Sequence, residues 1–456
     1  MTTTNRTEPQ APSRSEFAQD FLWGCATSSY QIEGAGSEDG RVESIWDRFC
    51  ATPGKVRDGS NGSVACDHYH RFPQDFAIAQ DMGLNAYRFS IAWPRIFSEA
   101  GGKPNQKGLD FYSRLVDGML ERGLQPWATL YHWDLPQYLQ DIGGWESRGT
   151  VQRFLEFADV MSHRLGDRVK HWITHNEPWC ISMLGNFEGM HAPGKQDLHA
   201  ALQVCHHVLL SHGKAVPLIR ANVPDAKVGI SLSLHPVRPA SASAEDWAAM
   251  ERHDGLRYRW FLDPLFGKGY PEATMNRLRH AAPDVHPGDL EAMAVKTDFL
   301  GVNYYFPETI QHAPGHEPLD ARVLPPAGPD TTAMGWEVSP EGLSELLVRI
   351  QQDYNPGPVY ITENGSCYDD AVAADGSVPD VQRRHYLMRH LGALKNAIAA
   401  GVPVKGYFAW SLVDNFEWAE GYLRRFGLVH IDYATQERRL KDSGKWYRAF
   451  LKTETK

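Results

Sequence analysis

One pattern of hydrophobic and polar positions repeats along the chain from about residue 21 to its end. A short apolar run, rich in β-branched and aromatic residues, alternates with a longer stretch that has helical spacing. Runs of the first kind predict buried strands, and the longer amphipathic stretches predict helices. The predicted strands are residues 21–33 (a strand and its loop), 85–93, 125–133, 171–178, 227–234, 298–305, 359–365 and 404–412. The predicted helices are residues 72–82, 109–122, 151–165, 200–222, 340–354 and 381–400.

Eight strands that alternate with helices favour an α/β fold, a single (β/α)8 TIM barrel. We find no linker after residue 21, so we predict one domain over residues 16–456. Residues 1–15 are polar and rich in Pro and Thr, and we expect a disordered N-terminal tail without the apolar core of a signal peptide. The Pro- and Gly-rich segment 307–335 is predicted to be a long loop of the kind that often forms a functional rim.

Polar and aromatic side chains stand at the ends of nearly all the predicted strands. The active site of a TIM barrel lies at the C-terminal ends of its strands, where such side chains meet. The residues at these ends are Gln31, Arg88, His132, Asn176, Glu177, Asn303, Tyr305, Glu363 and Trp410. The sequence therefore predicts one polar pocket built by separate segments.

Two of these residues, Glu177 and Glu363, are acids that end apolar strands of similar pattern. A buried carboxylate is costly, so a matched pair indicates a function. Two carboxyl groups on opposite walls of a pocket are what glycoside hydrolysis requires. A separation of about 5–5.5 Å gives retention and about 6.5–9.5 Å gives inversion, and the strand pattern leaves both open.

Two motifs, Thr174-His-Asn-Glu-Pro178 and Ile361-Thr-Glu-Asn-Gly365, resemble the paired signatures of glycoside hydrolase family 1, the β-glucosidase family. Further blocks resemble the family in the same order along nearly the whole chain. These blocks are residues 21–24, 28–34, 88–95, 131–136, 191–194 and 410–418.

The resemblance implies a retaining, exo-acting β-glucosidase with a covalent glycosyl-enzyme intermediate. Glu363 would be the nucleophile, and Glu177 would be the acid in the first step and the base in the second. A charged Glu363 favours a protonated Glu177, and esterification of Glu363 removes that charge. Arg88 and Tyr305 would hold Glu363 ionised, and Asn303 would support the site.

The resemblance also implies a set of residues that bind the non-reducing sugar. They are Gln31, His132, Asn176, Tyr305, Glu417 and Trp418, with Trp410 as an apolar floor. Asn176 would meet the 2-hydroxyl, and Glu417 the 4- and 6-hydroxyls. The Glu417–Trp418 pair differs from phospho-sugar relatives and favours an unphosphorylated sugar. The expected substrates are β-glucosides and short β-linked oligosaccharides such as cellobiose, as in cellulose degradation, with some β-galactoside or β-fucoside activity.

Three other classes fit less well. A Schiff-base aldolase needs a lysine at the far end of a strand, whereas Lys227 and Lys405 stand at strand beginnings. A dinucleotide enzyme needs a different glycine spacing from that of residues 34–40. A sugar-binding protein without catalysis would not need both acids.

The composition and charge of the chain limit the kinds of binding partner that we expect. The net charge of the 456 residues is -10 and no basic block occurs, which argues against nucleic acid. No apolar run approaches the roughly 18 residues of a membrane span. We expect no metal or organic cofactor, and the sequence leaves open whether the protein forms a homo-oligomer. His206, His207 and His212 have helical spacing, which we interpret as a helix face rather than a metal site.

The six cysteines are scattered and form no Cys-x-x-Cys motif. In a chain of this length they are typical of reduced thiols, which predicts a cytoplasmic location.

Overall fold

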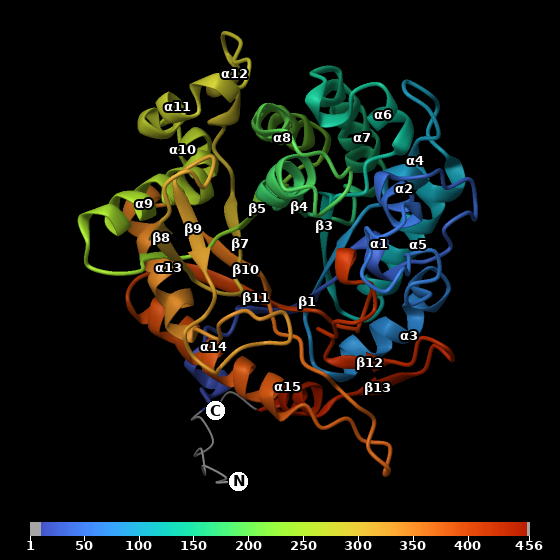
Figure 1. Ribbon diagram of the computed structural model, residues 1–456. Helices are drawn as coiled ribbons and strands as arrows, with labels where there is room; N and C mark the ends of the chain where they lie inside the picture. Colours follow the sequence, from blue (N-terminus) through green and yellow to red (C-terminus); the bar gives the residue numbers. More distant parts are fainter. Residues whose placement is uncertain (1–10, 454–456) are drawn as a thin grey trace.

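The computed structural model describes residues 11–453 and shows a closed barrel of parallel strands inside a layer of helices (Figure 1). The barrel strands are β1 (Leu22–Ala26), β2 (Ala86–Ser90), β3 (Gln125–Tyr131), β4 (His171–Asn176), β5 (Lys227–Ser233), β7 (Phe299–Asn303), β10 (Val359–Asn364) and β11 (Val404–Trp410). Strand β11 pairs with β1 and closes the barrel. The predicted TIM barrel and all eight of its predicted strands are confirmed.

The six predicted helices are also present; helix 340–354 has the predicted bounds, and the other five differ at one or both ends. They are α3 (His68–Asp81), α5 (Gln106–Leu120), α7 (Gly149–Leu165), α8 (Leu198–Asn222), α13 (Pro340–Tyr354) and α14 (Val381–Ala399). Helix α8 begins where the Asp197 side chain accepts a hydrogen bond from the backbone N–H of Ala200, at 3.0 Å. Such a cap satisfies a free N–H group at the first turn. Helix α15 (Asp442–Lys452) ends the described chain.

Short elements lie in the connections of the barrel. The N-terminal half has η1 (Arg14–Glu16), α1 (Ser29–Ile32), α2 (Ile45–Ala51), α4 (Trp93–Ile96), α6 (Gln137–Asp141), η2 (Gly144–Glu146) and η3 (Cys180–Phe187). Between β5 and β7 lie β6 (Val237–Pro239), α9 (Ala244–Asp254), η4 (Gly255–Arg259), α10 (Trp260–Leu265), α11 (Glu272–Arg277), η5 (Arg279–Ala281) and α12 (Asp289–Met293). After β11 come η6 (Trp418–Glu420), β12 (Val429–Ile431) and β13 (Arg438–Leu440).

The prediction of a loop over residues 307–335 is wrong in part. This segment contains β8 (Glu308–His312) and β9 (Ala321–Leu324), which pair antiparallel and join β6 in a second, three-stranded sheet. These strands are short and half exposed, so they lack the continuous apolar run that marks a barrel strand. Their pairing, which the sequence pattern does not show, makes them strands.

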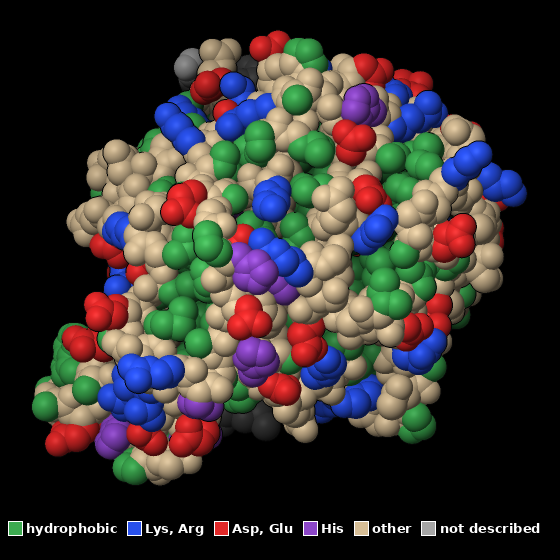
Figure 2. Space-filling model, turned by 90° about the horizontal axis from the view of Figure 1, so that it is seen from above, with side chains coloured by type: hydrophobic (Ala, Val, Ile, Leu, Met, Phe, Trp, Pro, Cys, Tyr) green, Lys and Arg blue, Asp and Glu red, His purple; other side chains and the backbone are tan. Residues whose placement is uncertain are grey.

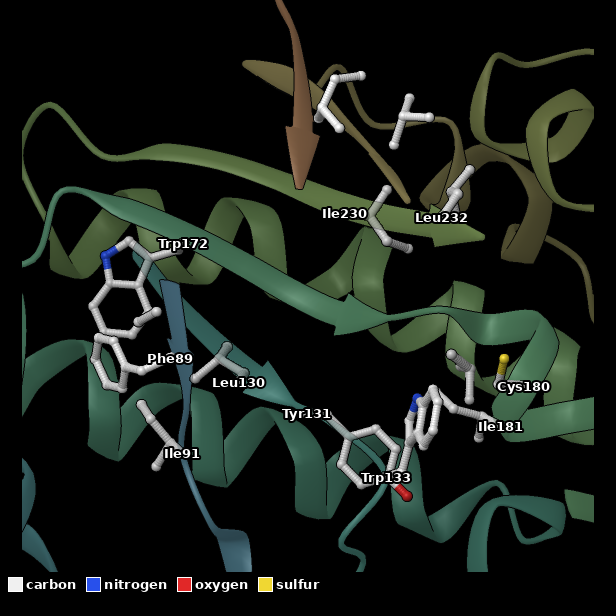
Figure 3. Close-up of a cluster of buried hydrophobic side chains, with 14 of the residues drawn as sticks. Phe89, Ile91, Leu130, Tyr131, Trp133, Trp172, Cys180, Ile181, Ile230 and Leu232 are labelled. Carbon is white, nitrogen blue, oxygen red and sulfur yellow. The ribbon is translucent and has the colours of Figure 1, made fainter. Parts of the chain in front are cut away.

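Large aromatic side chains fill the inside of the barrel. The ring of Trp127 on β3 lies 5.2 Å from that of Phe299, 4.6 Å from that of Tyr360 and 5.2 Å from that of Phe408. These residues come from β7, β10 and β11, which are not neighbours of β3, so the rings meet across the barrel. On the outside, side chains of β2 to β5 such as Phe89 and Leu130 pack in a separate apolar layer (Figure 3).

Strands β4 and β10, which end next to the two acids, are each irregular near their C-terminal ends. The register of β4 against β5 shifts between Ile173 and Asn176, and that of β10 shifts between Ile361 and its last residues. A bulge changes the direction in which a side chain points. After β10, a Cβ atom at Gly365 would collide with the carbonyl oxygen of Trp410, so glycine is required by close approach.

Most of the predicted N-terminal tail lies outside the described residues. The part at residues 11–15 is placed: Ser13 caps η1, and the buried Arg14 lies over the ring of Trp23. Glu16 forms an ion pair of 2.9 Å with Lys395 on α14. Within the range of the predicted tail, Arg14 is therefore packed against β1.

Figure 2 shows Lys and Arg side chains intermixed with Asp and Glu over one face of the molecule, with hydrophobic side chains between them. Among the helices of residues 11–453, none has the length and apolar character that crossing a membrane would require.

Candidate active site

A cavity of about 280 Å³ brings both acids together with the predicted sugar-binding residues. Its lining includes His132, Glu177, Tyr305, Glu363, Trp410, Glu417 and Trp418. The remaining predicted residues, Gln31, Arg88, Asn176 and Asn303, are fully buried and hydrogen-bond to this lining. The sequence-predicted residues thus form one connected site.

Glu363, near the end of β10, is held by two strong donors. Arg88 donates to Oε1 at 2.6 Å, and the Tyr305 hydroxyl donates to Oε2 at 2.7 Å. Burial raises the pKa of Glu363 to about 7; Arg88 opposes this effect, and Glu177 adds to it only when Glu177 is itself ionised. Arg88 also donates to the carbonyl oxygen of Thr362 and to the hydroxyl of Thr129, so the guanidinium has a fixed orientation.

Glu177 follows the last residue of β4 and has weaker donors. Its Oε1 accepts a hydrogen bond of 2.9 Å from the Asn303 amide, and its Oε2 accepts one of 3.2 Å from the Cys180 thiol. Its φ of 48° lies in the left-handed region, which a non-glycine residue rarely adopts. Such strained residues cluster at functional sites, and here the strain accompanies the turn from β4 into η3.

Asn176 and Asn303 connect the two acids through hydrogen bonds. Arg88 donates to Asn176 Oδ1 at 2.7 Å, and Asn303 Nδ2 donates to the same oxygen at 3.0 Å and to Glu177. Because arginine can only donate, the Asn176 atom that faces Arg88 is the amide oxygen, which accepts. Asn303 must therefore present its nitrogen, not its oxygen, to this atom, which fixes the orientation of the Asn303 amide. Asn176 Nδ2 lies 3.1 Å from His132 Nε2.

A third buried acid, Glu417, lies in the same cavity. Gln31 Nε2 contacts Glu417 Oε2 at 3.3 Å, and Ser28 fixes Gln31 by donating to its Oε1 at 2.6 Å. Burial, followed by the charges of Glu363 and Glu177, raises the pKa of Glu417 to about 8. A protonated Glu417 can both donate to and accept from a hydroxyl group.

Aromatic rings surround this acid. The ring of Trp418 lies 4.5 Å from those of Trp133 and Trp46, and its backbone φ is 49°. The ring of Trp410 lies 6.0 Å from that of His132 and nearly parallel to it. In Figure 3, Trp133 lies beside Ile181, close to Cys180. Flat apolar faces next to hydrogen-bonding groups match a sugar ring, which has C–H faces and a hydroxyl rim.

Several members of the site do not follow from the sequence pattern. Thr129 and Thr362 orient Arg88, Ser28 orients Gln31, and the Cys180 thiol contacts Glu177 directly. Each of them stands within a few residues of a predicted site residue, and this proximity was the available signal. Further residues that line the cavity are Trp179, Leu184, Glu188, His191, His235, Arg257, Trp336 and Phe426. Cys180 belongs to the same lining, which extends the cavity beyond the predicted residues.

The interpretation of three histidines as part of a helix is confirmed. His175 precedes them in the chain and points to the outside of the barrel, where Nε2 contacts Ser211 of α8 at 2.7 Å. His206, His207 and His212 lie on α8, where His212 contacts Thr174 and His206 contacts Asp289. All six cysteines are free thiols.

Comparisons with known proteins agree with this site. The model of the family described as Glycosyl hydrolase family 1 matches residues 13–456. "Beta-glucosidase A" of Thermotoga maritima is 47% identical over 441 residues, covering 96% of this chain and 98% of the relative. A bifunctional β-D-glucosidase/β-D-fucosidase of Bifidobacterium breve is 43% identical and covers 95% of this chain and 98% of its own length.

Solved structures agree as well. The T. maritima β-glucosidase in complex with glucoimidazole has a TM-score of 0.93 and 46% identity, covering 96% of this chain and 99% of its own. An enzyme from Alicyclobacillus herbarius has a TM-score of 0.94 and 48% identity, covering 97% of this chain and 98% of its own. Since the family model and these relatives extend over almost the entire length, the chain belongs to glycosyl hydrolase family 1, and it is an O-glycosyl hydrolase.

Proposed function

We propose that the protein is a retaining, exo-acting β-glucosidase that removes terminal non-reducing β-D-glucosyl residues by double displacement. The observation that carries this proposal is the unequal donor set of the two acids. Glu363 accepts from a guanidinium and a phenol, whereas Glu177 accepts from an amide and a thiol. Hydrogen bonds from charged donors are roughly twice as strong as neutral ones, so the negative charge of the pair belongs on Glu363.

In the first step, the ionised Glu363 attacks the anomeric carbon and forms a glycosyl ester. Glu177 gives its proton to the glycosidic oxygen as the bond to the aglycone breaks. In the empty site, the neighbouring negative charges disfavour two ionised carboxylates, because like charges in a buried site repel. The proton of the pair therefore stays on Glu177, which has the weaker donors.

In the second step, Glu177 is the base. Esterification removes the charge of Glu363, so nothing at that position now opposes ionisation of Glu177. The carboxylate takes a proton from water, which attacks the anomeric carbon from the side of the departed aglycone. Two inversions give net retention.

For sugar recognition we propose the roles expected from the sequence. Asn176 meets the 2-hydroxyl, Gln31 and Glu417 bind hydroxyls at the far end of the sugar, and Trp410 supports its apolar face. Both Gln31 and Glu417 lie within one hydrogen-bonded group, which supports this reading. A 6-phosphate would add negative charge beside three carboxyl groups, so the preferred sugar is unphosphorylated.

The relatives support the substrate range. The B. breve relative is named for both β-glucosidase and β-fucosidase activity, and we propose both for this chain, with cellobiose and other short β-linked glucosides as substrates. We also propose that residues 16–456 act as one catalytic domain. A cytoplasmic location is proposed from the six unpaired thiols, since reducing compartments keep cysteines free.

The experiment is labelling with 2-deoxy-2-fluoro-β-glucosyl fluoride, followed by intact mass and peptide mapping. We expect one added fluoroglucosyl unit on the peptide that contains Glu363. Turnover of an aryl β-glucoside without any label would reject the covalent intermediate, and a label on another peptide would reject Glu363 as the nucleophile.

A further inference from the structure

Asn303 determines which oxygen of Glu177 carries a proton. Asn303 Nδ2 has no acceptor capacity and donates to Oε1 at 2.9 Å. The orientation of this amide is fixed on its other side, where Asn303 Oδ1 accepts a hydrogen bond of 2.6 Å from the Thr362 hydroxyl. Oε1 is therefore an acceptor in both protonation states of Glu177. Because the carbonyl oxygen of a carboxylic acid accepts better than its hydroxyl oxygen, the proton of the acid form is favoured on Oε2.

Oε2 is the oxygen that faces Cys180, whose Sγ lies 3.2 Å away. Cys180 is three residues after Glu177, and its backbone N–H donates to the Glu177 carbonyl oxygen at 2.9 Å. This bond belongs to the first turn of η3 and fixes the position of the thiol. The Cys180 side chain is buried at the wall of the catalytic cavity. Burial and the charge of Glu177 raise the pKa of the thiol well above its usual range, so it stays protonated.

From this geometry we infer that Cys180 is a positioning residue that lets Glu177 alternate between acid and base, because a thiol is both a weak donor and a weak acceptor. This inference depends on the acid–base role of Glu177 proposed above. In the acid form, sulfur holds the Oε2 proton weakly and leaves it available to the glycosidic oxygen. In the base form, the thiol satisfies the carboxylate without a strong preference for its ionised state.

A hydroxyl group at this position would behave differently. Serine donates strongly to a carboxylate and accepts strongly from a carboxylic acid. In the acid form, it would compete with the glycosidic oxygen for the proton. In the base form, it would stabilise the carboxylate and weaken the base. We therefore expect Cys180→Ser to impair both steps, although the two side chains are of similar size.

Other groups also act on Glu177 and must be unchanged for the comparison. The titratable and charged groups that face Glu177 and Cys180 from the surrounding elements are Glu363, Tyr305, Glu417 and Arg257. Cys180→Ser replaces none of these groups, so an effect on the pH profile that disappears in the Glu177→Gln background reports the contact between residue 180 and Glu177.

The test measures kcat/KM against pH for Cys180→Ser and Cys180→Ala, with Cys205→Ser as a matched control. Cys205 is a buried thiol on α8 that does not line the cavity. We expect the basic limb of Cys180→Ser to move to lower pH by about one unit, since an added hydrogen bond to the charged form favours it. Cys180→Ala should move the limb in the opposite direction, and Cys205→Ser should leave it unchanged.

A second measurement distinguishes an effect of Cys180 on proton transfer from an effect on packing. For Cys180→Ser, aryl β-glucosides with poor leaving groups should lose about tenfold in kcat/KM, and dinitrophenyl glucoside should lose much less, because a good leaving group needs little protonation. An unmoved basic limb in both Cys180 variants, with equal losses on all leaving groups, would reduce the thiol to a packing role and overturn the inference.

Glu177→Gln, measured in parallel, tests the function on which the inference rests. The pH profile of kcat/KM for Glu177→Gln should lose its basic limb, and kcat/KM should depend strongly on the leaving group. If it keeps the limb, the acid–base assignment fails, and this failure is distinct from that of Cys180. In the Glu177→Gln background, Cys180→Ser should have no further effect on the pH profile, and an effect there would also reject the inference.

Discussion

Arg88 and Glu363 form an ion pair of 2.6 Å in which the arginine side chain is completely buried. The same guanidinium contacts Asn176 through a second nitrogen, so one side chain orients both the proposed nucleophile and the neighbour of the acid. A planar fork with several fixed donors makes such a contact possible, and a lysine cannot reproduce it.

We therefore expect Arg88→Lys to lower kcat by about 100-fold or more, because the donor that faces the developing charge is displaced. The matched control is Arg95→Lys, which changes another buried arginine that is paired with Glu33 at 2.7 Å outside the cavity lining. Both variants should lose stability, but Arg95→Lys should keep most of its kcat. Steady-state kinetics on an aryl β-glucoside will decide, and equal kcat losses in the two variants would contradict a specific role of Arg88.

Tyr305 should set the acidic limb of the pH profile. Its hydrogen bond to Glu363 Oε2 lowers the pKa of that carboxyl group, against the larger effect of burial. In Tyr305→Phe this contribution is lost, so the pKa of Glu363 rises and a higher pH is needed to ionise the nucleophile. The acidic limb of kcat/KM should move to higher pH by about one unit.

For Tyr305→Phe, Tyr304→Phe is a suitable control. The Tyr304 hydroxyl donates to the carbonyl oxygen of Ser339 and does not reach Glu363. A limb that stays in place in Tyr305→Phe, or that moves equally in both variants, would be inconsistent with the proposed ionisation of Glu363.

Azide should give opposite products in variants of the two acids. In Glu363→Ala, azide can enter the vacated space and displace the aglycone once, so a β-glucosyl substrate should give an α-glucosyl azide. In Glu177→Ala, Glu363 still forms the intermediate, and azide then attacks from the opposite side to give a β-glucosyl azide. NMR of the anomeric proton distinguishes the two products, and the reverse pattern would exchange the two roles.

The local pattern predicted the barrel and the polar residues at its strand ends, whereas Glu417 and Trp418 were expected only from the resemblance to the family. A strand such as β10 shows its apolar run, and Glu363 stands near its end. The pairing of β8 with β9 and the bulges of β4 and β10 depend on contacts between distant segments, which a local pattern does not contain. The thiol contact of Cys180 was missed because its direction is set by the turn into η3.

Buried ion pairs between distant segments could not be predicted from the local sequence pattern either. Lys441, at the start of α15, is fully buried and contacts Asp370 at 2.5 Å and Asp414 at 2.6 Å. Asp414 lies between Trp410 and Glu417, so this pairing connects the loop that carries two site residues to the C-terminal helix. From the sequence alone, a lysine side chain is expected to be exposed, because lysine is almost never fully buried unless it is paired.

Lys441→Met should therefore destabilise the protein by about 3 kcal/mol or more, because it leaves buried carboxylates with one cation fewer. Burial opposes ionisation of Asp414, but Lys441 and Arg425 outweigh it and lower its pKa. A lowered carboxyl pKa stabilises the folded state above the ordinary value of about 3.9 and loses this effect as the pH falls through the lowered pKa. Urea unfolding at neutral pH should show the full difference between Lys441→Met and the unchanged protein, and the difference should shrink in acid.

The control is Lys452→Met, whose exposed lysine pairs with Asp81 at 3.2 Å and should cost less than about 1 kcal/mol. Equal stability of the two variants at neutral pH would show that the buried pairing of Lys441 contributes no more than a surface ion pair.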